Sequence, residues 1–265
     1  MMERLGKVGL ALGGGGAKGL AHIGLLKALE EYHIPIIKVA GTSMGSIIGA
    51  LYCAGYSADE IHEMFRTEKI RSGFNLDLFN GGLANLKGAR KLLNKYIAHD
   101  SFSGLQIPLY ITATNLNTGK LKVVSQGDNL SEWITASASV PIAFVPTKIE
   151  GVTYIDGGLL MNLPAEPLMV DCDTILGSNV MPYLKSDKVD GARTVAEKSF
   201  VLSIQQNVRN SRINCDYWFE PPYISNYSMW DFGKLEEIVN LGYHHAVQII
   251  SEQIKLEHKL LPTKR

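Results

Sequence analysis

Two glycine-rich turns organise this sequence, Gly13-Gly14-Gly15-Gly16-Ala17-Lys18-Gly19 and Gly41-Thr42-Ser43-Met44-Gly45. Each follows a short apolar run (residues 7–12 and 36–40) and precedes a helical pattern (residues 17–32 and 43–54). A strand–helix–strand–helix order predicts a right-handed βαβ unit, and continuously apolar strands are typical of a parallel sheet buried on both faces. The expected fold class is therefore α/β.

Further elements are expected after this unit. Strands are predicted at 109–114, 121–124, 144–149, 152–155 and 173–180, and helices at 57–65, 89–98, 130–139 and 233–260. The strands at 144–149 and 152–155 are expected to form a hairpin around Glu150-Gly151. Residues 200–204 fit a strand or a helix equally well. Residues 71–88 have no clear period and could form a plain connector or a lid near a mouth of the site. Because no repeat or linker divides the 265 residues, a single domain over 1–265 is expected, with its motifs within 7–165.

The composition excludes several classes of protein. Lys+Arg and Asp+Glu are both 26, so the formal net charge is zero, and no basic footprint for nucleic acid is present. The three cysteines form no CxxC pair and fit reduced thiols in the cytoplasm. No run approaches the roughly 18 apolar residues of a transmembrane helix. A soluble cytoplasmic protein is expected, with peripheral membrane contact left open and the oligomeric state unknown.

The first turn also satisfies the dinucleotide fingerprint Gly14-x-Gly16-x-x-Gly19. That interpretation requires an acidic residue at the end of the second strand to hold the ribose. Here the second strand ends at Gly41 and leads into Thr42. A phosphate-binding loop requires Gly-Lys-Ser/Thr, whereas Lys18 precedes its glycine. A nucleotide-binding oxidoreductase therefore remains a weaker alternative.

The second turn has the form G-x-S-x-G, which places Ser43 on a sharp strand-to-helix turn with its hydroxyl exposed. Gly41 and Gly45 stand where side chains would clash as the strand and helix pack together. The first turn offers backbone N–H groups at a helix N-terminus, which suit developing negative charge. A nucleophile and an oxyanion cradle are two of the three parts of an acyl-transfer site.

The third part is a base, and the histidines are weak candidates for it. In the chain order of α/β-hydrolases the base would be His244 or His245. Both lie within the amphipathic C-terminal pattern, where a packed or solvated histidine is expected. His22 lies one turn into the first helix and is expected to be packed.

Asp156 is a better candidate for the base. It closes an apolar strand and is followed by Gly157 and Gly158, which permit close backbone approach. At the carboxyl end of a strand in a parallel sheet, its carboxylate would face the crevice where α/β sites form. Near a serine hydroxyl, this carboxylate can act as a general base if burial desolvates it enough to raise its basicity. An ordinary Asp-Gly turn accounts for the same residues equally well.

Four stretches together resemble the patatin-like phospholipases, which are lipid acyl hydrolases with a Ser–Asp dyad. Residues 12–24 resemble the family's oxyanion loop and first helix, and residues 41–51 resemble its nucleophile elbow. Residues 136–146 resemble its Ser/Pro-rich block, and residues 156–158 its Asp-Gly-Gly element. The final hundred residues match only loosely.

The resemblance implies a three-layer α/β/α fold with a mostly parallel sheet. It implies Ser43 as the nucleophile, Asp156 as its base and the amides of Gly14, Gly15 and Gly16 as the oxyanion hole. The implied supporting positions are Lys18, at the family's Arg/Lys position, and Gly19, Gly41, Gly45, Gly157 and Gly158.

The implied activity is hydrolysis of a phospholipid, lysophospholipid or neutral glyceride ester. No calcium-loop signature is present in the sequence, so hydrolysis without a metal or cofactor is expected. The alternative within the same fold is a catalytically weak lipid-binding or regulatory module.

Overall fold

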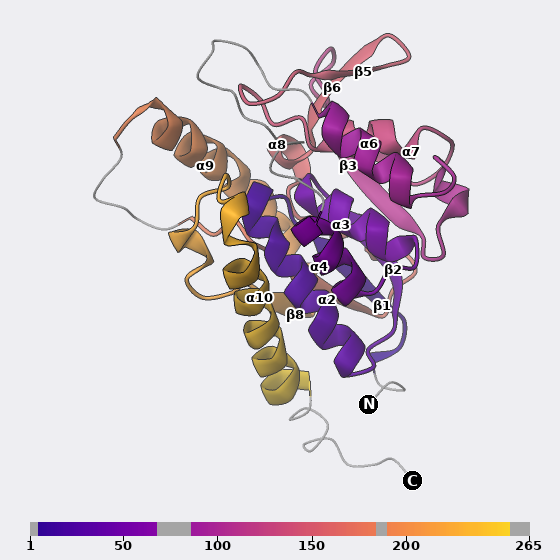
Figure 1. Cartoon of the computed structure of the whole chain (residues 1–265), viewed down its shortest axis with the longest axis vertical. Coiled ribbons are helices and arrows are strands. Elements are labelled where there is room, and N and C mark those ends of the chain that lie inside the picture. The colour runs from indigo at the N-terminus through magenta and orange to yellow at the C-terminus, as the bar shows by residue number, and fades with distance from the viewer. Residues whose placement is uncertain (1–4, 68–85, 184–189, 255–265) are drawn as a thin grey trace.

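The computed structural model describes residues 5–67, 86–183 and 190–254 (Figure 1). These residues surround one mixed sheet in the order β5-β6-β3-β2-β1-β7-β8, with β4 also paired to β3. The strands are β1 (Val8–Leu12), β2 (Ile36–Gly41), β3 (Leu109–Asn115), β4 (Lys120–Val124), β5 (Thr147–Ile149), β6 (Val152–Asp156), β7 (Thr174–Ser178) and β8 (Tyr217–Phe219).

The central strands are parallel, as the sequence predicts. β1 pairs in parallel with β2 and β7, β3 extends the parallel set beyond β2, and β8 extends it beyond β7. β4, β5 and β6 join through antiparallel pairs. The last residues of β1 and β2, Leu12 and Gly41, are direct register partners. Both glycine-rich turns therefore leave the sheet side by side.

The helices agree with most of the expected positions. They are α2 (Ala21–Glu31), α3 (Met44–Cys53), α4 (Ala58–Thr67), α6 (Lys87–Tyr96), α7 (Leu130–Ser137), α8 (Gly158–Met161), α9 (Ala192–Arg212) and α10 (Leu235–Ile249). A 3-10 turn, η1 (Gly16–Leu20), precedes α2, and a second, η4 (Glu166–Leu168), follows α8.

Several boundaries differ from the sequence expectations. Residues 200–204 are helical and lie within α9. The C-terminal helix ends at Ile249 and continues as a π-helical stretch, Ile250–Ile254; residues 255–260 lie outside the described residues. The expected loop at 71–88 lies outside them as far as residue 85. The three-residue strand β8 was not predicted, because so short a segment carries no readable period.

Both faces of the sheet are covered. Leu10 and Leu12 of β1 pack into the large core that includes α2, α3 and α10, whereas Ala11 points to the opposite face. There Ala11 packs in a smaller cluster with Ala40 and Leu168. The first layer of helices lies in front of the strands in Figure 1. The second layer is made of α8 and η4, which contact β1, β2 and β3.

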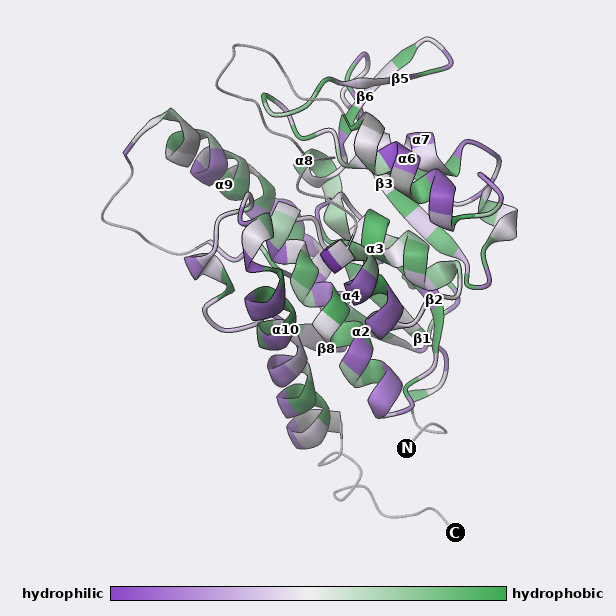
Figure 2. Ribbon diagram, viewed as in Figure 1, coloured by the Kyte–Doolittle hydropathy of each residue, from purple (hydrophilic) through white to green (hydrophobic). Residues whose placement is uncertain are grey.

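Two glycines let α2 and α10 cross at close range. A Cβ on Gly24 would lie 2.1 Å from the Val239 carbonyl oxygen, and one on Gly242 would lie 2.2 Å from the Ala21 carbonyl oxygen. Any side chain at either glycine would therefore push the helices apart. In Figure 2 hydrophilic residues lie along the outward sides of α4 and α10.

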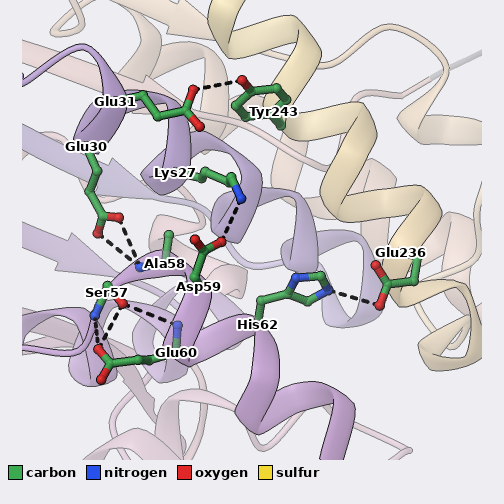
Figure 3. A network of polar contacts seen from close by, with 10 residues as sticks. All are labelled: Lys27, Glu30, Glu31, Ser57, Ala58, Asp59, Glu60, His62, Glu236 and Tyr243. Carbon is green, nitrogen blue, oxygen red and sulfur yellow. Dashed lines mark hydrogen bonds and ion pairs between the residues drawn. The ribbon is translucent and has the colours of Figure 1, made fainter.

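Polar contacts join the outer surfaces of α2, α4 and α10 (Figure 3). They are Tyr243 to Glu31 (2.7 Å), His62 to Glu236 (3.2 Å) and Lys27 to Asp59 (2.7 Å). Helix α4 begins with a capping box. The Ser57 N–H donates to Glu60 at 2.8 Å, and the Glu60 N–H donates to the Ser57 hydroxyl at 3.3 Å.

Candidate active site

Ser43 occupies a strained turn between β2 and α3. Its backbone has φ 53° and ψ −123°, a conformation that residues other than glycine rarely adopt. A Cβ on Gly41 would lie 2.5 Å from the Gly45 carbonyl oxygen, and one on Gly45 would lie 2.2 Å from the Leu12 carbonyl oxygen. Both flanking glycines are therefore required for the close packing of strand and helix, as the motif predicts.

Hydroxyl groups from three elements hold this turn in place. The Ser43 N–H donates to Ser137 Oγ of α7 at 2.8 Å, and Ser46 Oγ donates to the Ser43 carbonyl at 2.7 Å. The Thr42 and Thr112 hydroxyls share a hydrogen bond of 2.6 Å between β2 and β3. The strained conformation of Ser43 is thus fixed by its surroundings, which is how such strain persists in folded proteins.

Asp156 arrives at the site on an antiparallel strand. β6 pairs antiparallel with β3, with Asp156 opposite Ala113. The expectation of a parallel strand was wrong here, because β5 and β6 form a hairpin that runs back along β3. β2 ends opposite Ile111, two positions before Ala113. The returning strand therefore brings Asp156 to the level at which β2 gives way to Ser43.

The environment of Asp156 favours its neutral form. The side chain is buried, with 1% of the residue exposed, and burial raises its pKa to about 7. The neighbouring Ser43 side chain and the Gly158 N–H, which donates to Oδ1 at 2.7 Å, act in the opposite direction. Oδ2 is buried and accepts no hydrogen bond of normal geometry within the described part of the chain. This oxygen is available to take a proton.

The glycine-rich loop presents two adjacent amides. The Gly13 N–H donates to the Ser178 carbonyl at 3.0 Å, and the Ala17 N–H donates to the Met229 carbonyl at 2.8 Å. Between them, the N–H groups of Gly15 and Gly16 have no hydrogen-bond partner among residues 5–67, 86–183 and 190–254. Two neighbouring unpaired amides beside a serine suit an oxyanion.

Gly14 lies close to both Ser43 and Asn162. Its N–H donates to the Asn162 carbonyl at 3.1 Å, so this amide is already used within the fold. A Cβ on Gly14 would lie 3.0 Å from Ser43 Cβ and 2.7 Å from Asn162 Oδ1. Gly14 therefore allows the loop to lie directly against the serine.

His22 supports the glycine-rich loop through a hydrogen bond to Gly13. The ring is fully buried, with Nε2 2.8 Å from the Gly13 carbonyl and Nδ1 2.9 Å from Ser178 Oγ. Because a carbonyl can only accept, Nε2 donates and Nδ1 accepts from the serine. Burial lowers the pKa of His22 to about 4, so the ring is neutral near pH 7. His22 is packed, as expected, and both ring nitrogens are occupied.

The C-terminal histidines lie in α10 and bond elsewhere. His245 Nε2 accepts the Glu220 N–H at 3.3 Å, and the ring of His244 packs against that of Tyr243 at 5.3 Å. His245 is thus a half-buried helix residue and His244 an exposed one, which agrees with the sequence expectation of packed or solvated helix histidines. Asp156 is the base candidate that the fold brings to Ser43.

Lys18 is buried at the junction of three segments. Its Nζ lies 3.8 Å from Glu197 Oε1 of α9, and burial lowers its pKa while Glu197 and Asp231 oppose that shift. Glu197 also accepts from Ser228 Oγ at 2.7 Å and from the Met229 N–H at 2.9 Å. These contacts bind the glycine-rich loop to residues 228–231.

The remaining motif glycines pack closely against their neighbours. A Cβ on Gly19 would lie 2.5 Å from Met44 Cγ, and one on Gly157 would lie 2.3 Å from Thr112 Oγ1. A Cβ on Gly158 would lie 2.9 Å from Asp156 Oδ1. The structure thus explains these glycines by the space around the serine and the aspartate.

Asn162 was missed by sequence reasoning. It is buried, and it contacts Gly14 through its backbone carbonyl and through Nδ2, which donates to the Gly14 carbonyl at 3.3 Å. Asn207 of α9 supports it by accepting the Asn162 N–H at 3.0 Å and by donating to the Gly158 carbonyl at 2.9 Å. A lone amide within the apolar run after Asp156 is the signal that could have found it.

A small apolar pocket opens beside Ser43. Its walls come from both glycine-rich turns, from the segment after α7 and from residues 229–232. The lining residues are Gly16, Ser43, Met44, Ile47, Ala138, Val140, Phe144, Met229, Trp230 and Phe232. A pocket lined in this way accepts a hydrocarbon group and offers it few polar partners.

Residues 5–67, 86–183 and 190–254 contain no metal-binding cluster, no membrane-spanning helix and no disulfide. No group of three or more His, Cys, Asp or Glu side chains there is arranged to hold a metal ion. No helix there has both the length and the apolar character needed to cross a bilayer. Cys53, Cys172 and Cys215 are all free thiols.

The strand–turn–helix geometry at Ser43 is that of a G-x-S-x-G turn in an α/β protein. The family model for patatin-like phospholipase matches residues 10–169. The chain belongs to the patatin-like phospholipase family. Membership favours the hydrolase interpretation over the dinucleotide-binding alternative.

Curated relatives support the same assignment. The chain is 30% identical to Lysophospholipase nte1 of Neosartorya fischeri, over 96% of this chain and 19% of the relative. It is 29% identical to Lysophospholipase NTE1 of Kluyveromyces lactis, over 94% of this chain and 20% of the relative. The chain therefore spans about a fifth of the length of these curated relatives.

Solved structures share the fold at low identity. VipD from Legionella pneumophila matches with a TM-score of 0.53 and 14% identity, over 92% of this chain and 66% of that one. ExoU, in its heterodimeric complex with SpcU from Pseudomonas aeruginosa, matches with a TM-score of 0.52 and 17% identity, over 95% of this chain and 52% of that one. These similarities concern the α/β fold alone.

Proposed function

We propose that this chain is a lipid acyl hydrolase of the phospholipase or lysophospholipase type, with Ser43 as nucleophile and Asp156 as general base. The observation that carries the proposal is a buried carboxyl group with a pKa of about 7 beside a strained serine. A carboxylate with that pKa is basic enough to accept a hydroxyl proton during attack and is substantially ionised at neutral pH. The apolar pocket beside the serine supports an acyl substrate.

In the first half-reaction, Ser43 Oγ attacks the ester carbonyl carbon while the Asp156 carboxylate accepts the hydroxyl proton. The carbonyl oxygen becomes an oxyanion that accepts hydrogen bonds from the Gly15 and Gly16 amides. This differs from the sequence expectation by leaving out Gly14, whose amide is bonded to Asn162. Collapse of the intermediate breaks the ester C–O bond, and the alcohol leaves with the proton held by Asp156.

In the second half-reaction, water takes the place of the alcohol. Asp156 accepts a proton from the water as its oxygen attacks the Ser43 ester. The same two amides hold the second oxyanion. Collapse releases the fatty acid, and the proton on Asp156 returns to Ser43 Oγ, so the enzyme is regenerated with one water consumed.

The pocket and the relatives together suggest the first substrate to test. The pocket next to Ser43 has an apolar lining, which suits an acyl group. The relatives from N. fischeri and K. lactis are named lysophospholipases, and lysophospholipids carry one acyl chain. A monoacyl phospholipid is therefore the proposed substrate of this chain.

The test measures fatty acid release from lysophosphatidylcholine by the wild type and by Ser43→Ala, Asp156→Asn and His244→Ala. The proposal expects both site variants to lose nearly all turnover and His244→Ala to retain it. If His244→Ala were folded and as inactive as Ser43→Ala, a histidine triad would replace the Ser–Asp pair. Lipid binding without hydrolysis by the wild type would favour the weakly catalytic module instead.

A further inference from the structure

The segment that forms one wall of the pocket also carries a strained, exposed isoleucine. Val140, Pro141, Ile142 and Ala143 make a tight turn, closed by a 3.2 Å hydrogen bond from the Ala143 N–H to the Val140 carbonyl. Proline stands at the second position, and the third position, Ile142, has φ 72°. This is the pattern of a type II turn, whose third position normally holds glycine or asparagine.

An isoleucine is the wrong residue for this turn on two grounds. A β-branched side chain at positive φ is strained, because its Cβ crowds the backbone. The Ile142 side chain also gains no burial in return, since 74% of the residue is exposed. Both local effects disfavour isoleucine, and strain of this kind points to a role outside the fold.

The position of the turn indicates what that role is. Val140 and Phe144 on either side of Ile142 line the pocket beside Ser43, so the turn forms part of the pocket wall. Ile142 points away from the core, and Val145, just beyond Phe144, is 48% exposed. Residues 138–146 lead from α7 to β5, at the end of the molecule where β5, β6 and α8 lie (Figure 1).

We propose that Ile142 and Val145 form an apolar docking site that inserts into a lipid surface and sets the pocket against it. This inference rests on the proposed function, because a lipid substrate must leave an aggregate to reach Ser43. Contact through an apolar turn next to the pocket lets an acyl chain pass from the lipid phase into the pocket with little exposure to water.

The charge of the chain favours an apolar mode of contact. The formal net charge is zero, with 26 basic and 26 acidic residues, so no long-range attraction draws the protein to anionic lipid. Binding through Ile142 and Val145 therefore depends on burial of apolar surface. It should occur on zwitterionic lipid and should be insensitive to salt.

The test uses Ser43→Ala protein, which leaves the lipid intact, and vesicles of phosphatidylcholine containing lysophosphatidylcholine. Binding is measured by flotation at low and high salt. Ile142→Gly relieves the strained φ, so its thermal midpoint should equal or exceed that of the parent. Its vesicle affinity should fall roughly ten-fold or more, because burying an isoleucine side chain in an apolar phase is worth about a factor of ten to a hundred.

Two further variants test whether weaker vesicle binding is specific to this turn or follows from the loss of any exposed apolar side chain. Val145→Ser leaves the turn intact and should also weaken binding. Val170→Ser is the matched control: Val170 is 87% exposed and lies before the start of β7, whereas Ser43 lies at the opposite, carboxyl end of the parallel strands. It should bind vesicles like the parent.

Equal vesicle binding by the parent and Ile142→Gly would overturn the proposal, as would a parent that does not bind vesicles at all. Self-association lost in Ile142→Gly without a change in vesicle binding would overturn it in favour of a second copy. Hydrolysis of a soluble short-chain ester by the wild-type chain tests the proposed function separately. Failure of that assay leaves the vesicle result to stand on its own.

Discussion

Replacing Asp156 with asparagine should abolish turnover and stabilise the fold at the same time. The pKa of Asp156 is raised from 3.8 to about 7 because the carboxyl is buried. Between these two values the folded state holds a proton that the unfolded state has lost, so this group lowers stability progressively as pH rises from about 4 to 7. Above pH 7 the reduction in stability caused by this group no longer changes with pH. Asparagine keeps the shape of the side chain and removes the charge.

The magnitude follows from the size of the shift. About three pKa units at about 1.4 kcal/mol each give an upper bound of about 4 kcal/mol above pH 7. The Gly158 N–H still has an oxygen to bond, but that bond becomes weaker by about 1 kcal/mol when the acceptor is neutral. The expected gain at pH 8 is therefore roughly 2–4 kcal/mol, or roughly 4–16 °C in melting temperature.

The assay is denaturant unfolding of the wild type and Asp156→Asn at pH 8 and at pH 4. The gain should be present at pH 8 and nearly absent at pH 4. Asp171→Asn is a control whose effect on stability should have the opposite sign. Lys38 lowers the pKa of Asp171, so the ionised Asp171 carboxylate stabilises the folded state at pH values above its unfolded pKa. Wild-type kcat/KM should rise with pH through about 7. An Asp156→Asn variant less stable than wild type at both pH values would refute this account of the carboxyl.

Four other predictions concern the rest of the site. Ser43→Gly and Ser43→Ala should both be inactive, but unfolding should show the glycine variant to be more stable by about 1 kcal/mol, because φ 53° suits glycine; equal stability would count against strain. Gly16→Ala should lower both melting temperature and turnover, since φ is 55° and its Cβ would lie 2.3 Å from the Met229 carbonyl oxygen; wild-type values would contradict the packing. His244→Ala should change kcat/KM by less than about two-fold, and a larger loss in folded protein would implicate α10. Ile47→Trp should reduce turnover of long acyl esters more than that of short ones, because Ile47 lines the pocket; equal reduction would place the acyl chain elsewhere.

Local motifs made much of the site predictable. The elbow at Ser43 follows from two glycines at fixed offsets, whose side chains would collide with backbone. The parallel centre of the sheet follows from continuously apolar runs that alternate with helical periods. Asp156 could be chosen over the histidines because His244 and His245 lie in a continuous helical pattern.

Other parts depend on contacts between distant segments. The hairpin of β5 and β6 could be predicted from its Glu150-Gly151 turn, but the antiparallel pairing of β6 with β3 could not. The Gly14 N–H donates to the Asn162 carbonyl, and the Asn162 side chain donates to the Gly14 carbonyl. These two residues are 148 positions apart in the chain, so neither hydrogen bond could be predicted from local sequence. Residues 229–232 form one wall of the pocket and are held in position by the ion pair between Lys18 and Glu197. These two residues are also far apart in the chain.

The central claim is that Asp156 activates Ser43. The most direct measurement is labelling of the purified chain with a fluorophosphonate probe, with the modified peptide mapped by mass spectrometry. Wild type would be compared with folded Ser43→Ala and Asp156→Asn. We expect a single modification at Ser43 that is lost in Ser43→Ala and strongly slowed in Asp156→Asn. Labelling of Ser43 at an equal rate in Asp156→Asn, or labelling at another residue alone, would contradict it.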